Sequence, residues 1–280
     1  MREMNVLRIA AFSDNEVGGN PAGVVIADEL PLSDEMMRVA SEIGFSETAF
    51  ATKQGSGWRV RYFSPAAEVP FCGHATIALG AALALKYGGG AFPLIFNLGE
   101  ISVEARLRDD VFAVALQSPP TRSRTVAPIV VSEALALFGY SQEDVDPEIP
   151  PAVVHAGADH LVLMLNRRQA LSSMKYDFET GRALMMREGW VTVLIGYAET
   201  PQLFHTRNAF AYGGVYEDPA TGAATAALAG YLRDIQWPHK GSLEIIQGQD
   251  MGMRSLLRAD FSSEIGSSIR VSGTARVMQP

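Results

Sequence analysis

Hydrophobic positions along the chain fall into short runs that alternate with polar, Gly-rich and Pro-rich segments. In the stretch SDEMMRVASEIG at 33–44 the apolar residues recur with the period of an α-helix, with Ser33 or Asp34 as the expected N-cap and Gly44 as the stop. The same reading predicts helices at 131–139 and around 178–188, and strands at 5–12, 22–27, 47–52, 58–64, 93–98, 101–107, 111–117, 151–157, 160–166, 190–198, 203–210, 241–248, 255–261 and 268–278.

Two helical segments differ from the others because they are apolar nearly all round. They are HATIALGAALALKYG at 74–88 and TGAATAALAGYLRD at 221–234, and expected strands flank each of them in sequence. A helix without a polar face must be buried, so a sheet should enclose each of these helices on most sides. The Pro-rich stretch SPPTRSRTVAP at 118–128 is the expected domain boundary. Two helices, each wrapped by a sheet, are therefore the simplest architecture.

The start of each apolar helix carries a similar motif. EVPFCGHATIAL at 68–79 and EDPATGAATAAL at 217–228 are identical at seven of twelve positions when the second is shifted by 149 residues. Chance similarity between Ala-rich helix starts is the alternative, but shared Glu, Pro, Gly and Ala-Thr in one register favour an internal duplication. A chain of 280 residues also lies near the length at which one hydrophobic core divides into two.

Both motifs place a glycine, Gly73 or Gly222, at a helix start. The first backbone N–H groups of a helix have no intrahelical partner and carry partial positive charge, so such ends bind anions. If the two halves face each other across a pseudo-two-fold axis, both helix starts are expected at one cleft, where they would hold a carboxylate. The alternative is that each glycine only allows a tight turn from strand to helix.

Composition excludes several classes of partner. The net charge is −8 and no block of Lys or Arg occurs, so nucleic acid is not expected. No apolar run reaches the length of a membrane span or of a signal-peptide core, so we expect no membrane partner and a cytoplasmic location. Cys72 is the single cysteine, which excludes an intrachain disulfide and a racemase that needs two thiols.

No metal or cofactor is expected. The segment HAGADH, with His155, Asp159 and His160, matches no zinc spacing. The GGG at 88–90 follows a helix and lacks the Lys of a P-loop, and EVGGNPAG at 16–23 is not a dinucleotide-binding motif.

Several motifs together resemble the PhzF-like family of phenazine biosynthesis, relatives of diaminopimelate epimerase. They are NPAGVV, FSETAF, RYFSPAAEVPFCGHAT, EDPATGAA, QGQDMG and VSGTA, in family order from residue 19 to residue 275. The resemblance implies an α+β fold of two pseudo-symmetric domains, each a mostly antiparallel sheet rolled around a central buried helix, with the active site between them. The expected domains are 1–118, joined by a returning strand at 267–280, and 119–266. A homodimer is a further expectation.

The resemblance also implies roles for individual residues. It places the acid/base glutamate of the family on Glu47, its histidine on His74 and its aspartate on Asp218. One glutamate can take a proton from one carbon and return it to another if burial raises its pKa towards neutrality. His74 would position the substrate or pass protons, since the ordinary pKa of histidine lies near working pH. The expected substrate-binding residues are Asn20, Gly73, Gly222 and Ala223.

The expected function is that of a cofactor-independent isomerase that moves a proton on a small carboxylate. An epimerase or racemase of an amino or hydroxy acid, using Glu47 and Asp218 from opposite faces, is one alternative, and a non-catalytic binding protein is another. The chain departs from the usual family pattern at Ala223, where a Ser is common, and at Met253, where an Arg is common. The substrate therefore stays open.

Overall fold

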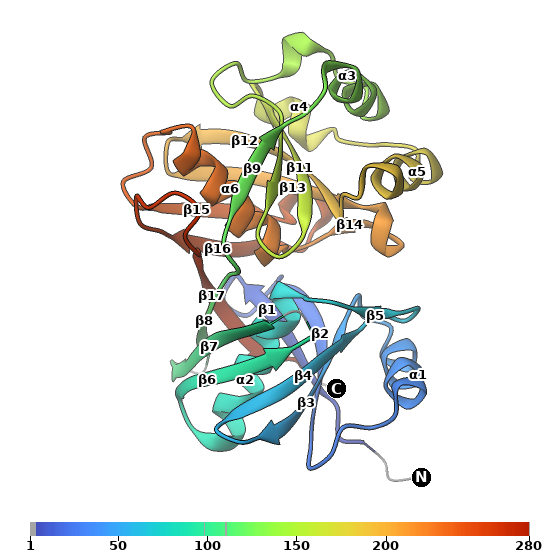
Figure 1. The fold of residues 1–280 in the computed structure, drawn as a ribbon, viewed down its shortest axis with the longest axis vertical. Helices are drawn as coiled ribbons and strands as arrows, with labels where there is room; N and C mark the ends of the chain where they lie inside the picture. Colours follow the sequence, from blue (N-terminus) through green and yellow to red (C-terminus); the bar gives the residue numbers. More distant parts are fainter. Residues whose placement is uncertain (1–3, 98, 110, 280) are drawn as a thin grey trace. The chain divides into compact units, whose positions relative to one another are not determined.

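The computed structural model describes residues 4–97, 99–109 and 111–279. The chain divides into two compact units (Figure 1): unit 1 is Met1–Gln117 with Ser272–Pro280, and unit 2 is Ser118–Val271. The predicted strand end at Leu98, and residues 1–3 and 280 of the predicted first domain, lie outside the described residues.

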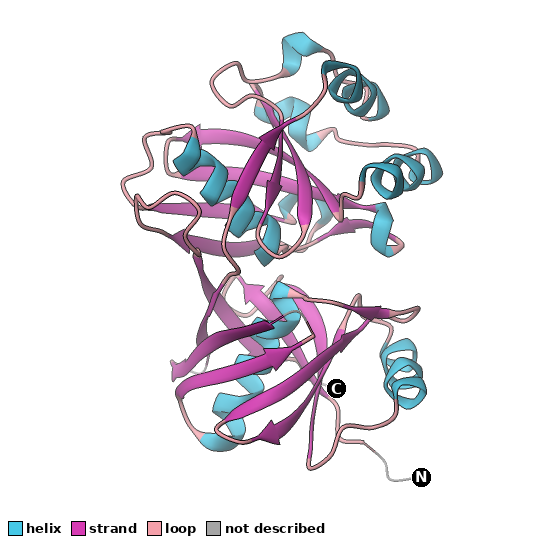
Figure 2. Cartoon of the chain, viewed as in Figure 1, coloured by secondary structure: helices cyan, strands magenta, loops and turns pink. Residues whose placement is uncertain are grey.

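Strands of unit 1 form a closed ring around a helix (Figure 2). The pairing runs β1–β2–β3–β4–β6–β7–β8–β17 and returns to β1. Of the pairs whose register is given by the structure, β2–β3 and β4–β6 are parallel and the others are antiparallel. A short strand, β5, pairs with β4. The strands are β1 (Leu7–Ser13), β2 (Asn20–Ala27), β3 (Thr48–Gln54), β4 (Gly57–Phe63), β5 (Glu68–Val69), β6 (Gly90–Phe96), β7 (Gly99–Arg108), β8 (Val111–Gln117) and β17 (Arg270–Val277).

The helix inside this ring is α2 (Gly73–Tyr87), which contacts β1, β2, β3, β6, β7 and β8. It is buried from Gly73 to Ala84, as its all-round apolar sequence predicts. Gly80 allows the close approach of the sheet, because a Cβ there would lie 2.6 Å from Val103 Cγ2 and 2.9 Å from Val114 Cγ1. The core of unit 1 is therefore packed around one helix.

Unit 2 also has its paired strands packed on a central helix, α6 (Gly222–Asp234), which contacts β9, β10, β11 and β16. Its pairing runs β9–β10–β11–β12–β13–β15–β16, with β14 added to β13. The strands are β9 (Arg122–Thr125), β10 (Ala152–His155), β11 (Asp159–Leu165), β12 (Thr192–Thr200), β13 (Leu203–Phe210), β14 (Val215–Asp218), β15 (Ser242–Gln247) and β16 (Ser255–Asp260).

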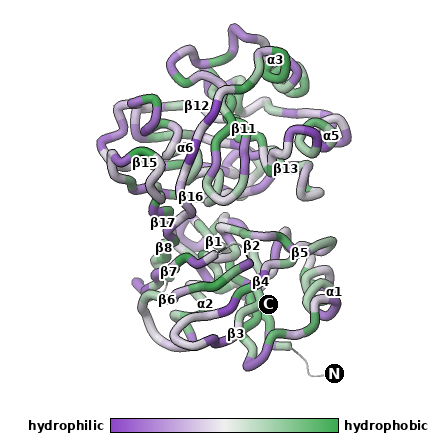
Figure 3. The backbone as a smooth tube through the Cα atoms, in the orientation of Figure 1, coloured by the Kyte–Doolittle hydropathy of each residue, from purple (hydrophilic) through white to green (hydrophobic). Residues whose placement is uncertain are grey.

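Outer helices cover part of each sheet. In unit 1, Met36, Val39 and Ala40 of α1 (Ser33–Ile43) pack against Phe50 and Phe63 of the sheet. In unit 2, a second core cluster joins the sheet to α3 (Pro128–Leu137), which is green along most of its length in Figure 3, and to α4 (Arg168–Ser172) and α5 (Phe178–Glu188). The short 3-10 helices of the unit are η1 (Gln142–Asp144), η2 (Ala211–Gly213) and η3 (Gln249–Met251).

The two units have the same topology. The series β1–β2–β3–β4–β6–β7 and the series β10–β11–β12–β13–β15–β16 both pair as antiparallel, parallel, antiparallel, parallel, antiparallel. In both units a short strand precedes the central helix and pairs with the fourth strand of the series. The internal duplication inferred from the helix-start motifs therefore extends to the order and direction of these strands.

Some local predictions differ from the structure. The N-cap of α1 is Leu32, so the predicted caps Ser33 and Asp34 are wrong; the Leu32 carbonyl accepts the N–H groups of Glu35 and Met36, and no side chain caps the helix. Gly44 ends α1 in the left-handed conformation, as predicted. The Pro-rich boundary segment contains strand β9, and α3 begins before the predicted residue 131. None of the helices that the structure describes is both long and apolar enough to cross a membrane.

Candidate active site

Glu47 lies directly before β3 and is buried, with 4% of its surface exposed. Its backbone carbonyl accepts the N–H of Gly23 on β2, which fixes the residue at the edge of the parallel pair β2–β3. The strands approach closely at this point, because a Cβ on Gly23 would lie 2.6 Å from Thr48 Oγ1. The glycine of the NPAGVV motif thus allows the strand start that positions Glu47.

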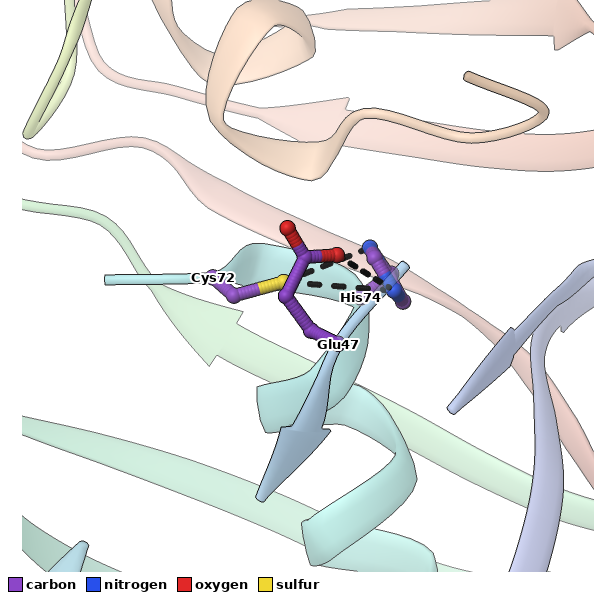
Figure 4. A group of neighbouring side chains, drawn as sticks. All are labelled: Glu47, Cys72 and His74. Carbon is purple, nitrogen blue, oxygen red and sulfur yellow. Dashed lines mark hydrogen bonds and ion pairs between the residues drawn. The ribbon is translucent and has the colours of Figure 1, made fainter. Parts of the chain in front are cut away.

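Cys72 and His74 reach Glu47 from the start of α2 (Figure 4). His74 Nε2 lies 3.4 Å from Glu47 Oε2 and 3.3 Å from Ser46 Oγ, and Cys72 Sγ lies 3.3 Å from His74 Nδ1. The helix start is held in turn by Thr76, whose hydroxyl donates to the Cys72 carbonyl at 2.7 Å. Two segments that are distant in sequence therefore bring a carboxyl, a thiol and an imidazole together.

Burial sets the protonation of this group. It raises the pKa of Glu47, and hydrogen bonds with Ser46 and Cys72 oppose that shift only in part. Glu47 Oε2 is buried and makes no hydrogen bond with any residue that the structure describes, so negative charge on this oxygen is poorly stabilised. The raised pKa agrees with the requirement that an acid/base glutamate should titrate nearer neutrality.

His74 differs from expectation in its charge. Burial lowers the pKa of His74 to about 3, so the imidazole is neutral at working pH. Of the two roles expected for His74, positioning a substrate agrees with this state. Passing protons as an imidazolium does not, because the ordinary histidine pKa on which that role depended is lost on burial.

The same three side chains are the group of described residues whose donor atoms lie close enough to share a metal ion. One ligand atom from each of Glu47, Cys72 and His74 lies within 4.8 Å of the other two. A thiol, an imidazole and a carboxylate are donor types that suit Zn²⁺. The three possible ligands of the HAGADH segment do not form one group. His155 Nδ1 contacts Asp159 at 2.5 Å, whereas His160 Nδ1 contacts Thr192 at 2.8 Å.

Asp218 belongs to unit 2, where it ends β14 and is buried. Its Oδ2 accepts a hydrogen bond from the Thr221 hydroxyl at 2.5 Å. Gln247 of the QGQDMG motif contacts the same turn, because its Nε2 donates to the Asp218 carbonyl at 2.7 Å and its Oε1 accepts the Thr221 N–H at 3.0 Å. This cluster lies at the start of α6, as the Glu47 cluster lies at the start of α2.

The residues expected to bind substrate have these positions. Asn20 begins β2, is buried and pairs with Ala11. Gly73 is the first residue of α2, and Gly222 is the first residue of α6. Ala223 follows Gly222 and is partly exposed. The structure thus brings Glu47 and His74 together within unit 1, and it places Asp218, Gly222 and Ala223 together within unit 2.

Strand register shows that the two clusters are not copies. Thr48 pairs with Phe63, which faces Glu68, and Val193 pairs with Ala209, which faces Glu217. The residue before Thr48 is Glu47, and the residue before Val193 is Thr192, whose hydroxyl bonds to His160 and Asn208.

The same alignment of registers gives Asp218 the position of Val69 in unit 1. At the helix starts, the shared motif gives Thr221 the position of Cys72 and Ala223 the position of His74. At these aligned positions, Glu47 of unit 1 corresponds to Thr192 of unit 2, and Asp218 of unit 2 corresponds to Val69 of unit 1.

Sequence reasoning did not assign roles to Ser46, Thr221 or Gln247. Ser46 precedes Glu47, and Thr221 lies three residues after Asp218, so closeness in sequence to a predicted site residue was the available signal. Gln247 is 26 residues from Thr221, and only its place in the QGQDMG motif marked it.

Comparison with known proteins agrees with the motifs. The PhzC-PhzF family model, described as phenazine biosynthesis-like protein, matches residues 9–279. An uncharacterized isomerase of Pseudomonas aeruginosa is 32% identical over 227 residues, which are 80% of this chain and 79% of the relative. A trans-2,3-dihydro-3-hydroxyanthranilate isomerase of Pseudomonas fluorescens is 31% identical over 96% of this chain and 95% of the relative.

The fold is similar to that of solved members. The crystal structure of a PhzF family protein from Bacillus anthracis has a TM-score of 0.87 with this chain and is 22% identical to it. The match covers 100% of this chain and 98% of the Bacillus anthracis chain. Together with the family match, this confirms the fold and the resemblance inferred from the motifs. The chain belongs to the PhzC-PhzF family of phenazine biosynthesis-like proteins, and it is an isomerase.

Proposed function

We propose that the chain moves a proton between two carbons of a small carboxylic acid, with Glu47 as the acid/base group. The observation that carries this proposal is the buried Glu47 carboxyl beside the start of α2. Its Oε2 makes no hydrogen bond within the described part of the chain, and His74 and Cys72 lie next to it. An ordinary structural glutamate would be solvated or paired with a cation. A carboxyl in this setting is a stronger base once ionised.

In the proposed reaction the Glu47 carboxylate removes a proton from one carbon of the substrate, and the electron pair of that C–H bond spreads into the conjugated acid. The protonated Glu47 then returns the same proton to a second carbon, so the enzyme ends in its starting state. The reaction consumes no other reagent. His74, neutral at working pH, donates or accepts a hydrogen bond that orients the substrate.

Backbone N–H groups at a helix start suit the carboxylate of such a substrate. We assign this role to the helix starts at Gly73 and at Gly222 with Ala223, with Asn20 as a further polar contact and Asp218 in support. The first substrate to assay is trans-2,3-dihydro-3-hydroxyanthranilate, because a relative that is 31% identical bears its name.

The test compares Glu47→Gln with Glu29→Gln, which makes the same change at an exposed glutamate of unit 1. Glu47→Gln should lower turnover by about 10²–10⁴-fold and should leave substrate affinity nearly unchanged. In deuterium oxide the wild type and Glu29→Gln should exchange or transfer a substrate C–H, and Glu47→Gln should not. Normal turnover by Glu47→Gln would remove this residue from the mechanism.

Asp218 supports a second candidate, an epimerase or racemase in which Glu47 and Asp218 act on opposite faces of one carbon. The supporting observation is that Asp218 is a second buried carboxyl at a helix start. In that case Asp218→Asn should block solvent exchange from one enantiomer and spare the other. Under the single-glutamate mechanism Asp218→Asn should slow the reaction without an enantiomer-selective pattern, which we favour because the position equivalent to Glu47 in unit 2 is Thr192.

A further inference from the structure

Gln247 is the last residue of β15 and is fully buried. Its side-chain amide makes three hydrogen bonds to one turn: Nε2 donates to the Asp218 carbonyl at 2.7 Å and to Thr221 Oγ1 at 3.0 Å, and Oε1 accepts the Thr221 N–H at 3.0 Å. Both donors of the amide are therefore used on the residues that begin α6.

These contacts fix the direction of the Thr221 hydroxyl. A hydroxyl has one hydrogen, and Thr221 Oγ1 accepts from Gln247 Nε2, so its own hydrogen is left to be donated to Asp218 Oδ2 at 2.5 Å. If the amide were flipped, with its oxygen and nitrogen exchanged, Gln247 Oε1 would face the Asp218 carbonyl oxygen, and Gln247 Nε2 would face the Thr221 N–H. Two acceptors and two donors would then oppose each other, so this orientation is excluded. The bonds therefore run in one direction, from Gln247 through Thr221 to the Asp218 carboxyl.

The backbone after Gln247 keeps this turn close. Gly248 has a φ of +72°, and a Cβ there would lie 2.4 Å from the Met253 carbonyl oxygen and 2.7 Å from that of Pro219. Any other residue would be strained and would push the QGQDMG turn away from the residue that follows Asp218. The glycine thus allows the amide to reach the helix start.

Unit 1 has no such brace at the corresponding position. Strand register aligns Phe96 with Gln247, since Trp58 pairs with Leu94 as Phe204 pairs with Ile245. Phe96 packs against Phe71, with ring centroids 5.4 Å apart. The polar brace therefore accompanies the one unit that carries an aspartate at the helix start.

We infer that Gln247 is a positioning residue for Asp218: it directs the Thr221 hydroxyl onto the carboxyl, and it occupies the Thr221 N–H so that the N–H groups of Gly222 and Ala223, which have no intrahelical acceptor, serve the substrate anion. This inference rests on the supporting role that the proposed function gives to Asp218.

The test is a double-mutant cycle on kcat/KM with Gln247→Met and Asp218→Asn. Gln247→Met keeps the length of the side chain and removes its donors and acceptor, so kcat/KM should fall about 10- to 100-fold, as it does when partners that orient functional groups are removed. The double variant should be no slower than Asp218→Asn alone. Gln249→Met, an exposed glutamine two residues along the chain, is the matched control and should match the wild type.

Independent losses that multiply in the double variant would mean that Gln247 acts without Asp218, and the inference would fail. Thr221→Val covers the case in which Gln247→Met does not fold, because it removes the hydroxyl and keeps the two bonds of the Gln247 amide to the backbone of Asp218 and Thr221. Wild-type kcat/KM in Thr221→Val would also overturn the inference. If Asp218→Asn has the kcat/KM of the wild type, the supporting role of Asp218 fails and Gln247 has nothing to position. If kcat/KM falls in Asp218→Asn but not in Gln247→Met, the inference about Gln247 is wrong while the proposed function stands.

Discussion

Burial shifts the pKa values of Glu47 and His74 in opposite directions, although their side chains lie 3.4 Å apart. The carboxyl is pushed towards its protonated form and the imidazole towards its unprotonated form, so both groups tend to be neutral. A neutral pair avoids the cost of two buried charges that share few other partners. When Glu47 ionises, the same burial makes its carboxylate a stronger base towards a substrate proton.

The Glu47 shift should appear in stability as a function of pH. The folded-state pKa of Glu47 is raised above its ordinary 4.5, so its contribution to stability is fully present below pH 4.5 and is lost as pH rises through the folded pKa. Glu47→Gln lacks this loss. The free energy of unfolding of Glu47→Gln, relative to that of the wild type, should therefore increase as pH rises above 4.5. Urea unfolding at a series of pH values measures the gap, and a gap that stays constant contradicts the shift.

His74 should act at the acid end. Its folded pKa of about 3 lies below the ordinary 6.5, so the unfolded chain binds the additional proton and stability is lost as pH falls from 6.5 towards 3. The slope from this residue is at most about 1.4 kcal/mol per pH unit. His74→Asn should lose less stability over the same range. Equal acid limbs in thermal unfolding of the two proteins would show that His74 is not buried as a neutral group.

At the scale of elements, the duplication repeats an Arg–Glu ion pair in two environments. Arg61 pairs with Glu68 between β4 and β5, and Arg207 pairs with Glu217 between β13 and β14, both at 2.5 Å. The side chains of the first pair are 21% and 27% exposed, and those of the second are 8% and 4% exposed. Arg207 also donates to the Ser172 carbonyl at 3.0 Å, at the end of α4.

These pairs provide a matched comparison of stability. Arg207→Met should cost about 3–5 kcal/mol in the free energy of unfolding, because it leaves Glu217 buried without its partner. Arg61→Met should cost about 0–1 kcal/mol, since solvent reaches Glu68. Chemical denaturation of both variants gives the two values. Similar costs would mean that the difference in burial does not control these pairs.

The packing of α2 predicts a cost for one added methyl group. Gly80→Ala would drive a Cβ to 2.6 Å from Val103, and such overpacking costs about 1–3 kcal/mol. Gly90→Ala is the control, because nothing lies within 4 Å of a Cβ at Gly90. The midpoint of denaturation should fall for Gly80→Ala and change little for Gly90→Ala. An unchanged midpoint for Gly80→Ala would show that the ring can expand around the helix.

The elements show which features the sequence could predict. The sequence predicted that α2 and α6 are buried, because a helix that is enclosed on every side has apolar residues all round and no polar face. The cap of α1 was wrong because Ser33 and Asp34 are suitable types, whereas the cap is set by where the backbone leaves the extended conformation, at Leu32. Strand β5 has two residues, too few for a periodic signal.

The candidate site follows the same division. Glu47, His74 and Asp218 stand in motifs that resemble a family and were found by that resemblance. Gln247 and Ser46 make contacts that only the fold brings together, so their residue types alone indicated no role. The lowered pKa of His74 likewise depends on burial, which the sequence around it did not indicate.

At the scale of the whole molecule, a duplicated fold carries an unequal set of chemical groups. Unit 1 holds Glu47 where unit 2 holds Thr192, and unit 2 holds Asp218 where unit 1 holds Val69. Two copies of one scaffold thus carry different acids near the starts of their central helices. This division agrees with a single proton-transfer group and a separate supporting carboxyl.

Strand β17 should control the integrity of unit 1 separately from unit 2. Ala275 is fully buried in β17, opposite Ala11 of β1. Ala275→Asp would bury an unpaired carboxyl at a cost of several kcal/mol, roughly 2–7 for an uncompensated polar group. Hydrogen exchange should then accelerate in α2 and much less in α6.

Val277→Asp, at a position in the same strand that is 42% exposed, is the control and should leave both helices protected. Equal acceleration in α2 and α6 after Ala275→Asp would show that the two units open together.

The closing of the unit 1 ring by β17 also has a consequence for biosynthesis. Strands β1 to β8 are translated first, yet the strand that lies between β1 and β8 is made only after the whole of unit 2. At 5–20 residues per second, the ribosome needs roughly 8–30 s to translate unit 2. During that time α2 sits in an open sheet whose edge strands β1 and β8 lack their shared neighbour, and such edges promote aggregation. Unit 2 is continuous in sequence and can complete its own pairing first, so the half whose translation begins later is the half that can finish folding earlier.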